Sequence, residues 1–104
     1  MTIQLNADKN LSIHEGFGDK LTATLEDELS RFTEHITRLE VHLSDENGNK
    51  QANEDKRCLL EARLEGKQPI AVTGNGNNYE QALDDAINKI KKVLDTLIDK
   101  MKTH

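Results

Sequence analysis

Aromatic residues are almost missing from this sequence, which holds two phenylalanines, one tyrosine and no tryptophan. A protein that binds single-stranded nucleic acid by stacking needs several aromatic side chains on an exposed surface. The pattern of the strands described below places none of the three on an exposed sheet face. Any contact with RNA would therefore have to use phosphates and shape.

Cysteine is equally scarce, because Cys58 is the only one. A single thiol excludes an intramolecular disulfide and a metal site built from several thiolates, and it fits a reducing compartment. The amino terminus has neither a basic start nor a long apolar run, so no signal peptide is predicted. No apolar stretch is long enough to span a membrane. These absences together predict a cytoplasmic protein.

Positive charge is in deficit, since the formal net charge is −5 at pH 7. This argues against indiscriminate binding to nucleic acid, which depends on Lys and Arg replacing counterions at phosphates. Apolar residues make up only 35% of the chain, but they recur with regular periods, and the chain has the size of one compact domain. We therefore predict a single domain over residues 1–104, in which only a local basic patch could contact RNA.

Apolar residues that alternate with polar ones predict four strands, and apolar residues at steps of three and four predict two helices. In chain order, the expected elements are a strand at 2–6, a helix at 15–33, strands at 38–44, 57–64 and 70–73, and a long helix with apolar positions from Leu83 to Met101, Val93 among them. Residues 65–67 are typical of a tight turn. Pro69, at the start of the fourth strand, favours an edge position.

The order of these elements predicts the topology. A strand–helix–strand crossover pairs its strands in parallel and is right-handed, whereas the last three strands should form an antiparallel meander. The predicted fold class is α+β: a two-layer sandwich in the order β-α-β-β-β-α, with a four-stranded mixed sheet and both helices on one face. Cys58 is expected to point into the core, and His42 and Leu59 to point outward.

Two glycines, Gly74 and Gly76, stand between the fourth strand and the long helix, where a dinucleotide-binding motif would lie. The third glycine of that motif would fall at Tyr79, and the chain has no room for a doubly wound sheet. We therefore interpret both glycines as turn residues. Asn77, followed by Glu80, matches the spacing of a helix capping box.

Other local signals concern the ends of elements. Gly16 and Gly18 weaken the first turn of the helix at 15–33, which favours a late start. Polar turns are predicted at residues 8–10 and around residues 47–48, where Asn precedes Gly. Both turns would connect elements of the sandwich.

No set of residues is typical of an enzyme or a metal site. The histidines show no pair at metal-ligand spacing, the loop at 45–48 is too short for a calcium site, and the carboxylates at 26–28 occupy a polar helical face. We therefore predict no catalytic residue, no metal and no cofactor. A deep pocket lined by His42 and carboxylates would favour an enzyme instead.

The charges are distributed unevenly between the two expected helices. Five lysines and two aspartates leave +3 on residues 89–102, whereas six acidic and two basic residues leave −4 on residues 15–34. Lysines at the end of a helix complement its dipole. Lys89 and Lys92, however, lie one turn apart on an accessible face, which favours a ligand.

Several segments resemble one known family. Residues 82–84, 88–90, Lys92 and Leu94 resemble its pattern of Ala-Ile-Asp, Asp-Lys-Leu, Arg and Leu, and residues 38–45 and 55–58 resemble a short single-domain branch. On these residues the chain is similar to the ribosome hibernation factors, also called ribosome-associated inhibitors, ribosomal subunit interface proteins or sigma-54 modulation proteins. The resemblance covers nearly the whole chain and implies the order of elements predicted above.

In that family, the domain is implied to sit on the small ribosomal subunit, where messenger and transfer RNA would pass, and to block translation while it protects idle ribosomes. The first hypothesis is therefore a translation-silencing factor of the stress response that acts by steric occupancy and not as an enzyme. Lys89 and Lys92 match positions at which the family carries basic residues. The expected contacts with ribosomal RNA are made by Lys56, Arg57, Lys89, Lys91 and Lys92.

The acidic first helix supports an alternative, because typical members of the family have a strongly basic helical surface. Under this second hypothesis, the chain is a protein-interaction or stress-regulatory module that kept the fold and lost the ribosome. Its partner protein would contact the acidic first helix. A small enzyme is the third and weakest hypothesis, since no convergent nucleophile, base or metal ligands are visible.

Overall fold

The computed structural model describes residues 1–7, 15–45 and 56–102, without the side chains of residues 15, 101 and 102. The turns predicted at 8–10 and 47–48 lie outside these described residues. The elements in chain order are β1 (Thr2–Ala7), α1 (Glu15–Glu28), the short 3₁₀ helix η1 (Ser30–Phe32), β2 (Ile36–Asp45), β3 (Lys56–Leu64), β4 (Ile70–Gly76) and α2 (Tyr79–Lys102).

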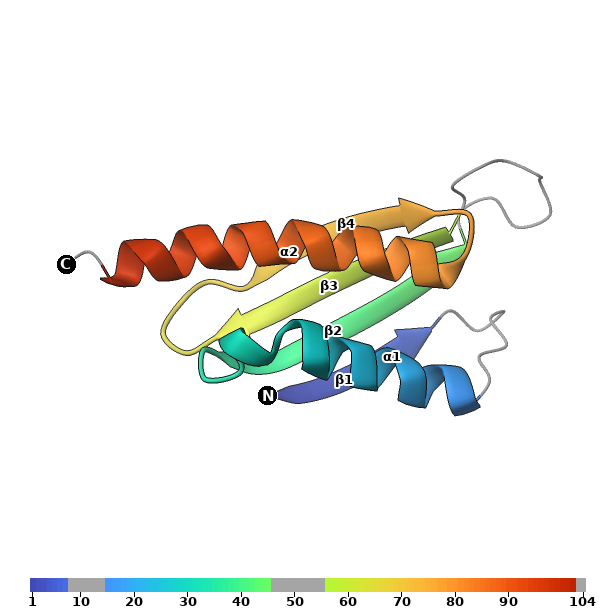
Figure 1. Ribbon diagram of the computed structural model, residues 1–104, viewed down its shortest axis with the longest axis horizontal. Helices are drawn as coiled ribbons and strands as arrows, with labels where there is room; N and C mark the ends of the chain where they lie inside the picture. Colours follow the sequence, from blue (N-terminus) through green and yellow to red (C-terminus); the bar gives the residue numbers. More distant parts are fainter. Residues whose placement is uncertain (8–14, 46–55, 103–104) are drawn as a thin grey trace.

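The four strands form one mixed sheet in the order β1-β2-β3-β4. β1 runs parallel to β2, and the other two pairs are antiparallel. Both helices lie on the same side of this sheet, α1 over β1 and β2 and α2 over β3 and β4 (Figure 1). The predicted α+β sandwich and its β-α-β-β-β-α order are therefore confirmed, and so is the edge position of the strand that follows Pro69.

The core lies between the sheet and the helices. Alternate residues of β2 and β3 point into it, and the same layer receives the apolar stripes of α1 and α2. Its members are Leu21, Leu25, Leu29, Phe32, Ile36, Leu39, Val41, Leu43, Cys58, Leu60, Ala62, Leu64, Ala82, Leu83, Ala86, Ile87, Ile90, Leu94 and Ile98. Cys58 is fully buried as predicted, and burial raises the pKa of its thiol to about 12, so it remains a neutral thiol.

The first helix differs from its prediction at both ends. It begins at Glu15 in spite of Gly16 and Gly18, so the predicted late start was wrong. It ends at Glu28 and not near residue 33, and η1 follows at once. The tighter 3₁₀ turn brings residues three apart onto one side, which lets Phe32 join Leu29 in the core. Tertiary packing thus outweighs the intrinsic cost of the glycines.

Gly74 and Gly76 are not turn residues, because β4 continues to Gly76. Both are buried beneath the first turns of α2. A Cβ on Gly74 would lie 2.2 Å from the carbonyl oxygen of Ala82 and 2.3 Å from the backbone nitrogen of Ala86. A Cβ on Gly76 would lie 2.7 Å from the nitrogen of Ala82. The glycines therefore allow the helix backbone to approach the strand. By contrast, Gly66 is a true turn residue at a φ of 73°, as predicted for residues 65–67.

The longer β4 also moves the cap of α2 by one residue. The side-chain oxygen of Asn78 accepts a hydrogen bond of 2.8 Å from the backbone N–H of Gln81, and the side-chain oxygen of Gln81 accepts one of 2.9 Å from Asn77. The predicted Asn77–Glu80 capping box is therefore wrong. Adjacent asparagines both suit an N-cap, and the end of the strand decides between them.

A first prediction follows from the contact of β4 with α2. Replacing Gly74 with alanine places a methyl group against helix backbone, which cannot move aside as a flexible side chain could. We expect Gly74→Ala to lower the free energy of unfolding by about 3 kcal/mol, measured by urea denaturation followed by circular dichroism.

Gly16→Ala is the matched control, because no heavy atom lies within 4 Å of the Cβ that it would add. This change in a helix should be neutral or stabilising by up to about 1 kcal/mol. Equal stability of Gly74→Ala and the wild type would contradict the close approach of α2 to β4.

Candidate nucleic-acid interface

Lys56 and Arg57 open β3 and point to opposite faces of the sheet, because successive strand residues alternate. The Nζ of Lys56 lies 2.9 Å from Asp45 Oδ2 and 6.0 Å from the ring centroid of Tyr79. Lys56 is half-buried beside the start of α2, whereas Arg57 is exposed on the face without helices. One flat ligand therefore cannot reach both side chains.

Lys89 occupies the flank of α2 that faces β4. Its Nζ donates a hydrogen bond of 2.8 Å to the carbonyl oxygen of Thr73 and lies 3.2 Å from Asp85 Oδ2. The same aspartate accepts a hydrogen bond of 3.0 Å from the backbone N–H of Asn75. This bond, followed by the contact with Lys89, holds the Asp85 pKa below its ordinary value. Lys89 is thus exposed but ties the helix to the edge of the sheet.

Lys91 and Lys92 are neighbours in sequence but differ in their surroundings. The Nζ of Lys91 lies 2.5 Å from Glu28 Oε1 on α1. Lys92 is exposed, and its side chain has no ion pair or hydrogen bond among the described residues. The structure therefore brings only Lys89 and Lys92 of the five predicted residues onto one accessible surface, one turn apart on α2.

Three ion pairs join α2 to α1 and η1, which sequence reasoning missed. Besides the Lys91–Glu28 pair, Lys20 on α1 lies 2.9 Å from Glu80 on α2. Arg31, in η1, lies 2.8 Å from Asp95. Exposed pairs contribute only about 0.2–1 kcal/mol each, so these three orient the helices more than they stabilise the fold. In two of the three pairs the basic residue lies in the acidic segment 15–34, so the net charge difference between the helices did not indicate them.

The face of the sheet without helices carries a polar cluster around Glu40, whose side chain is only 15% exposed. His42 Nε2 lies 3.7 Å from one of its oxygens, and Arg38 Nε and Arg63 Nη2 lie 3.7 and 3.5 Å from the other. Glu61 pairs with Glu40 across the strands and lies 3.5 Å from Arg63. The predicted outward position of His42 is confirmed, and the basic residues here offset two adjacent carboxylates.

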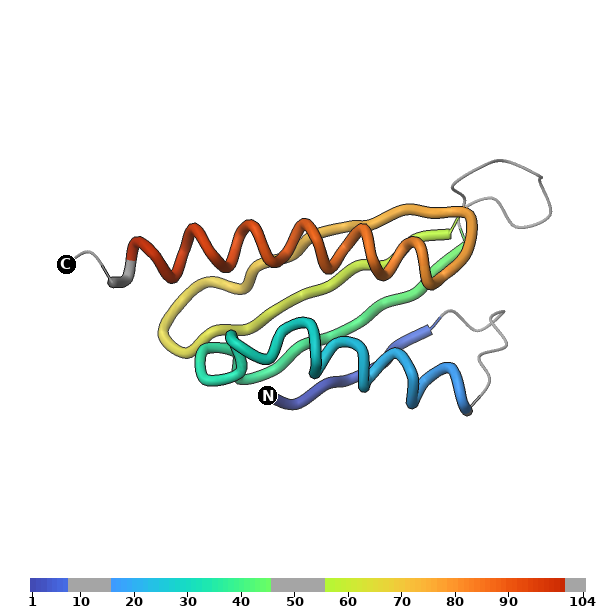
Figure 2. Tube along the Cα trace, in the orientation of Figure 1, coloured from blue at the N-terminus to red at the C-terminus, as the bar shows by residue number. Residues whose placement is uncertain are grey.

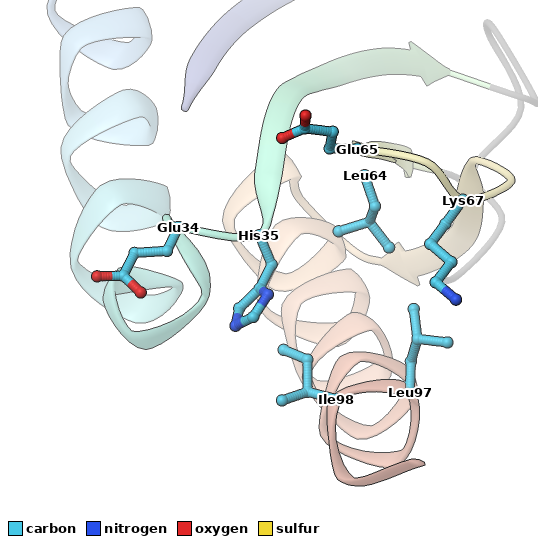
Figure 3. A pocket seen from close by; sticks show the side chains of 7 residues that line it. All are labelled: Glu34, His35, Leu64, Glu65, Lys67, Leu97 and Ile98. Carbon is cyan, nitrogen blue, oxygen red and sulfur yellow. The ribbon is translucent and has the colours of Figure 1, made fainter. Parts of the chain in front are cut away.

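A different histidine lines a pocket. A hollow of about 200 Å³ opens between the end of α2 and the turn after β3. Figure 3 shows His35 beside Ile98, Lys67 beside Leu97, and Leu64 between them, while Glu34 points away. Within the described ranges, no group of three or more His, Cys, Asp or Glu side chains could hold a metal ion. No helix in the same ranges combines the length and apolar character needed to cross a membrane.

Comparison with known proteins connects this fold to one family. Residues 8–102 match the family described as "Sigma 54 modulation protein / S30EA ribosomal protein". The N-terminal domain of Protein Y from Thermus thermophilus is 18% identical with a TM-score of 0.71, and the match covers 93% of this chain and 99% of that one. A ribosomal subunit interface protein from Coxiella burnetii is 17% identical with a TM-score of 0.72, covering 95% and 99%. No curated protein sequence matches the chain.

A second prediction concerns the pair of Lys89 and Asp85. Replacing Lys89 with glutamine removes one of the two contacts that lower the Asp85 pKa, while the bond from Asn75 remains. We expect the Asp85 pKa to rise part of the way toward 3.8, as measured by NMR titration of its carboxyl carbon. A depressed folded pKa contributes stability above the unfolded pKa, and this is lost as the pH falls through the folded value. The variant should lose part of it.

Lys92→Gln is the control for charge alone, because it removes the same charge one turn away without a contact to Asp85. It should leave the Asp85 pKa almost unchanged. If Lys89→Gln also leaves it unchanged, the Lys89–Asp85 contact does not persist in solution.

Proposed function

We propose, because this chain belongs to the family of sigma 54 modulation and S30EA ribosomal proteins, that it is a ribosome-associated factor that silences translation. In this proposal it works in the cytoplasm, binds the small subunit, and excludes other ligands by occupying their space, with no bond made or broken. The family match over residues 8–102 is the observation that carries the proposal. The subunit interface protein named above supports it through its shared fold.

The first contact with ribosomal RNA is assigned to Lys89 and Lys92. Both are exposed on one surface of α2, and lysines attract phosphates as point charges whatever the base sequence. Lys89 would exchange its contacts with the Thr73 carbonyl and Asp85 for a phosphate. The chain as a whole carries −5, so this local surface has to bind against a repulsive background. Binding should therefore weaken steeply as salt screens the few favourable contacts.

The other three predicted residues are half-buried or lie on another surface of the protein. Lys56 and Lys91 would have to exchange Asp45 and Glu28 for phosphates. Arg57 would have to meet RNA on the opposite face of the sheet. We therefore assign Lys56, Arg57 and Lys91 a supporting role in the proposed RNA contact.

The third prediction tests this assignment by co-sedimentation with ribosomes on a density gradient at low and physiological salt. We expect the protein to move with the small subunit or the whole ribosome at low salt. About four phosphate contacts would give a log–log salt slope of roughly −3 to −4. The double variant Lys89→Glu/Lys92→Glu should remain at the top of the gradient.

Lys20→Glu/Lys67→Glu is the matched control, since it changes the net charge equally but on α1 and on the β3–β4 turn. It should bind more tightly than the α2 variant. Wild-type protein that stays at the top of the gradient at low salt would refute ribosome binding. Equal binding by both double variants would show that Lys89 and Lys92 do not contribute to ribosome binding.

A second candidate function rests on the outer face of α1. Glu26 and Asp27 are exposed there and have no ion pair among the described residues. This acidic surface would suit a basic partner protein, in keeping with a fold that no longer binds ribosomes.

The fourth prediction distinguishes this candidate by affinity capture from a cell extract at low salt. If this candidate is correct, the wild type will recover one protein partner without ribosomal RNA. The variant Glu26→Lys/Asp27→Lys will lose that partner. Glu65→Lys/Asp99→Lys, with the same change of charge elsewhere, should retain it. Recovery of ribosomal RNA by the wild type would exclude this candidate.

A further inference from the structure

The second half of α2 carries an apolar strip that the sheet does not cover. The sequence places Val93 in the buried stripe of the helix, but it is 39% exposed in the folded chain, so that expectation was wrong. Leu97, one turn further on, is only half-buried. Leu94 and Ile98 in the same half are buried, so Val93 and Leu97 lie at the edge of the buried side of α2, whose carboxyl-terminal end reaches past the β3–β4 turn (Figure 2).

This strip continues into the hollow shown in Figure 3. Leu97 lines both the hollow, together with Leu64 and Ile98, and the open groove along Val93 and Thr96. One aliphatic surface therefore runs from the side of α2 to the end of β3. A ligand lying along it could insert a side chain into the hollow and rest a second one on Val93.

The rim of the aliphatic surface is mainly basic. Lys92 and Lys100 line the groove on either side of Val93 and Leu97, and Lys67 lines the hollow. Lys92 has no partner of its own within the described part of the chain. An apolar centre with a charged rim is the usual organisation of a protein–protein interface.

We propose that this surface, defined by Val93, Thr96, Leu97, the hollow and the three rim lysines, docks an acidic amphipathic helix of a partner protein. Two aliphatic side chains of that helix, one turn apart, contact Val93 and enter the hollow. Its Asp and Glu residues face Lys67, Lys92 and Lys100. The inference does not depend on ribosome binding.

Charge and chemistry favour this occupant over a second copy of the chain. Antiparallel pairing of two α2 helices about a two-fold axis near Thr96 would place Lys92 of each copy against Lys100 of the other. Like charges at an interface oppose association, so the lysine rim disfavours self-pairing.

RNA is a poorer occupant for a different reason. Val93, Leu97, Leu64 and Ile98 are aliphatic, and among the described residues no Phe, Tyr or Trp lines the groove or the hollow, where His35 offers one small ring for a base to stack on. Glu34 and Glu65 also border the hollow, and their negative charges would oppose the approach of a phosphate. The proposed peptide instead places an aliphatic side chain in the hollow.

The test is an NMR titration of the ¹⁵N-labelled full chain with a synthetic acidic peptide. The peptide has about 16 residues, above the length at which isolated helices are marginal, with leucines on one face and glutamates elsewhere. The surface is small compared with the roughly 800 Å² that each partner buries in a stable complex, so weak binding in fast exchange is expected. Shifts should concentrate at residues 92–100 and Lys67.

A peptide with the same glutamates and serine in place of leucine separates docking from charge attraction. It should cause much smaller shifts at the same concentration. Equal shifts with both peptides, shifts centred on α1 or the open sheet face, or no shifts at all would overturn the proposal. So would tighter binding of a single-stranded RNA oligonucleotide to these same residues.

Variants test the two parts of the surface separately. Val93→Ser should weaken peptide binding about tenfold, the change expected from losing one buried valine contact, and its exposed position should preserve the fold. Ala23→Ser on α1, also exposed, is the control and should bind like the wild type. Unchanged affinity of Val93→Ser would overturn the proposed centre of the site.

The same variants keep this inference distinct from the proposed function. Val93→Ser should co-sediment with ribosomes like the wild type, whereas Lys92→Glu should weaken both peptide and ribosome binding. Failure of peptide binding with normal co-sedimentation overturns only the docking surface. The reverse result overturns only the ribosome proposal.

Discussion

The contact between the start of α2 and β4 is the constraint on which the rest of the structure depends. At Gly74 and Gly76 the helix backbone approaches the strand so closely that only a hydrogen atom fits in place of a side chain. This approach places Asp85 within reach of the Asn75 backbone and Lys89 within reach of the Thr73 carbonyl. It also sets the direction of the helix, whose carboxyl-terminal end reaches past the β3–β4 turn (Figure 2).

The two halves of α2 differ in how far their apolar residues are covered. The first half, with Ala82 and Ala86, packs against β4 through small residues and contributes to the core. The second half is covered only in part, so Val93 and Leu97 reach solvent beside lysines. The second half therefore combines buried core residues, Leu94 and Ile98, with an exposed apolar edge that a partner can reach.

Several basic side chains of this protein form ion pairs within the fold, which leaves fewer of them for a ligand. Ion pairs between α2 and the segment formed by α1 and η1 occupy Lys20, Arg31 and Lys91. Lys56 is likewise engaged by Asp45. The basic surface left for a partner is therefore much smaller than a count of lysines and arginines would indicate, and it is centred on Lys92.

The sequence by itself determined the fold class. Apolar residues that recur at every second position, or at every third to fourth, indicate which side of a strand or helix is apolar. It could therefore place Leu39 or Cys58 inward and His42 outward. It misjudged Gly74, Asn77 and Val93, since each depends on how a helix lies against a strand. Only the tertiary structure decided which lysines remain accessible. The ion-pair partners of Lys91 and Arg31 lie 63 and 64 residues away along the chain, and no local pattern records the angle at which two helices meet.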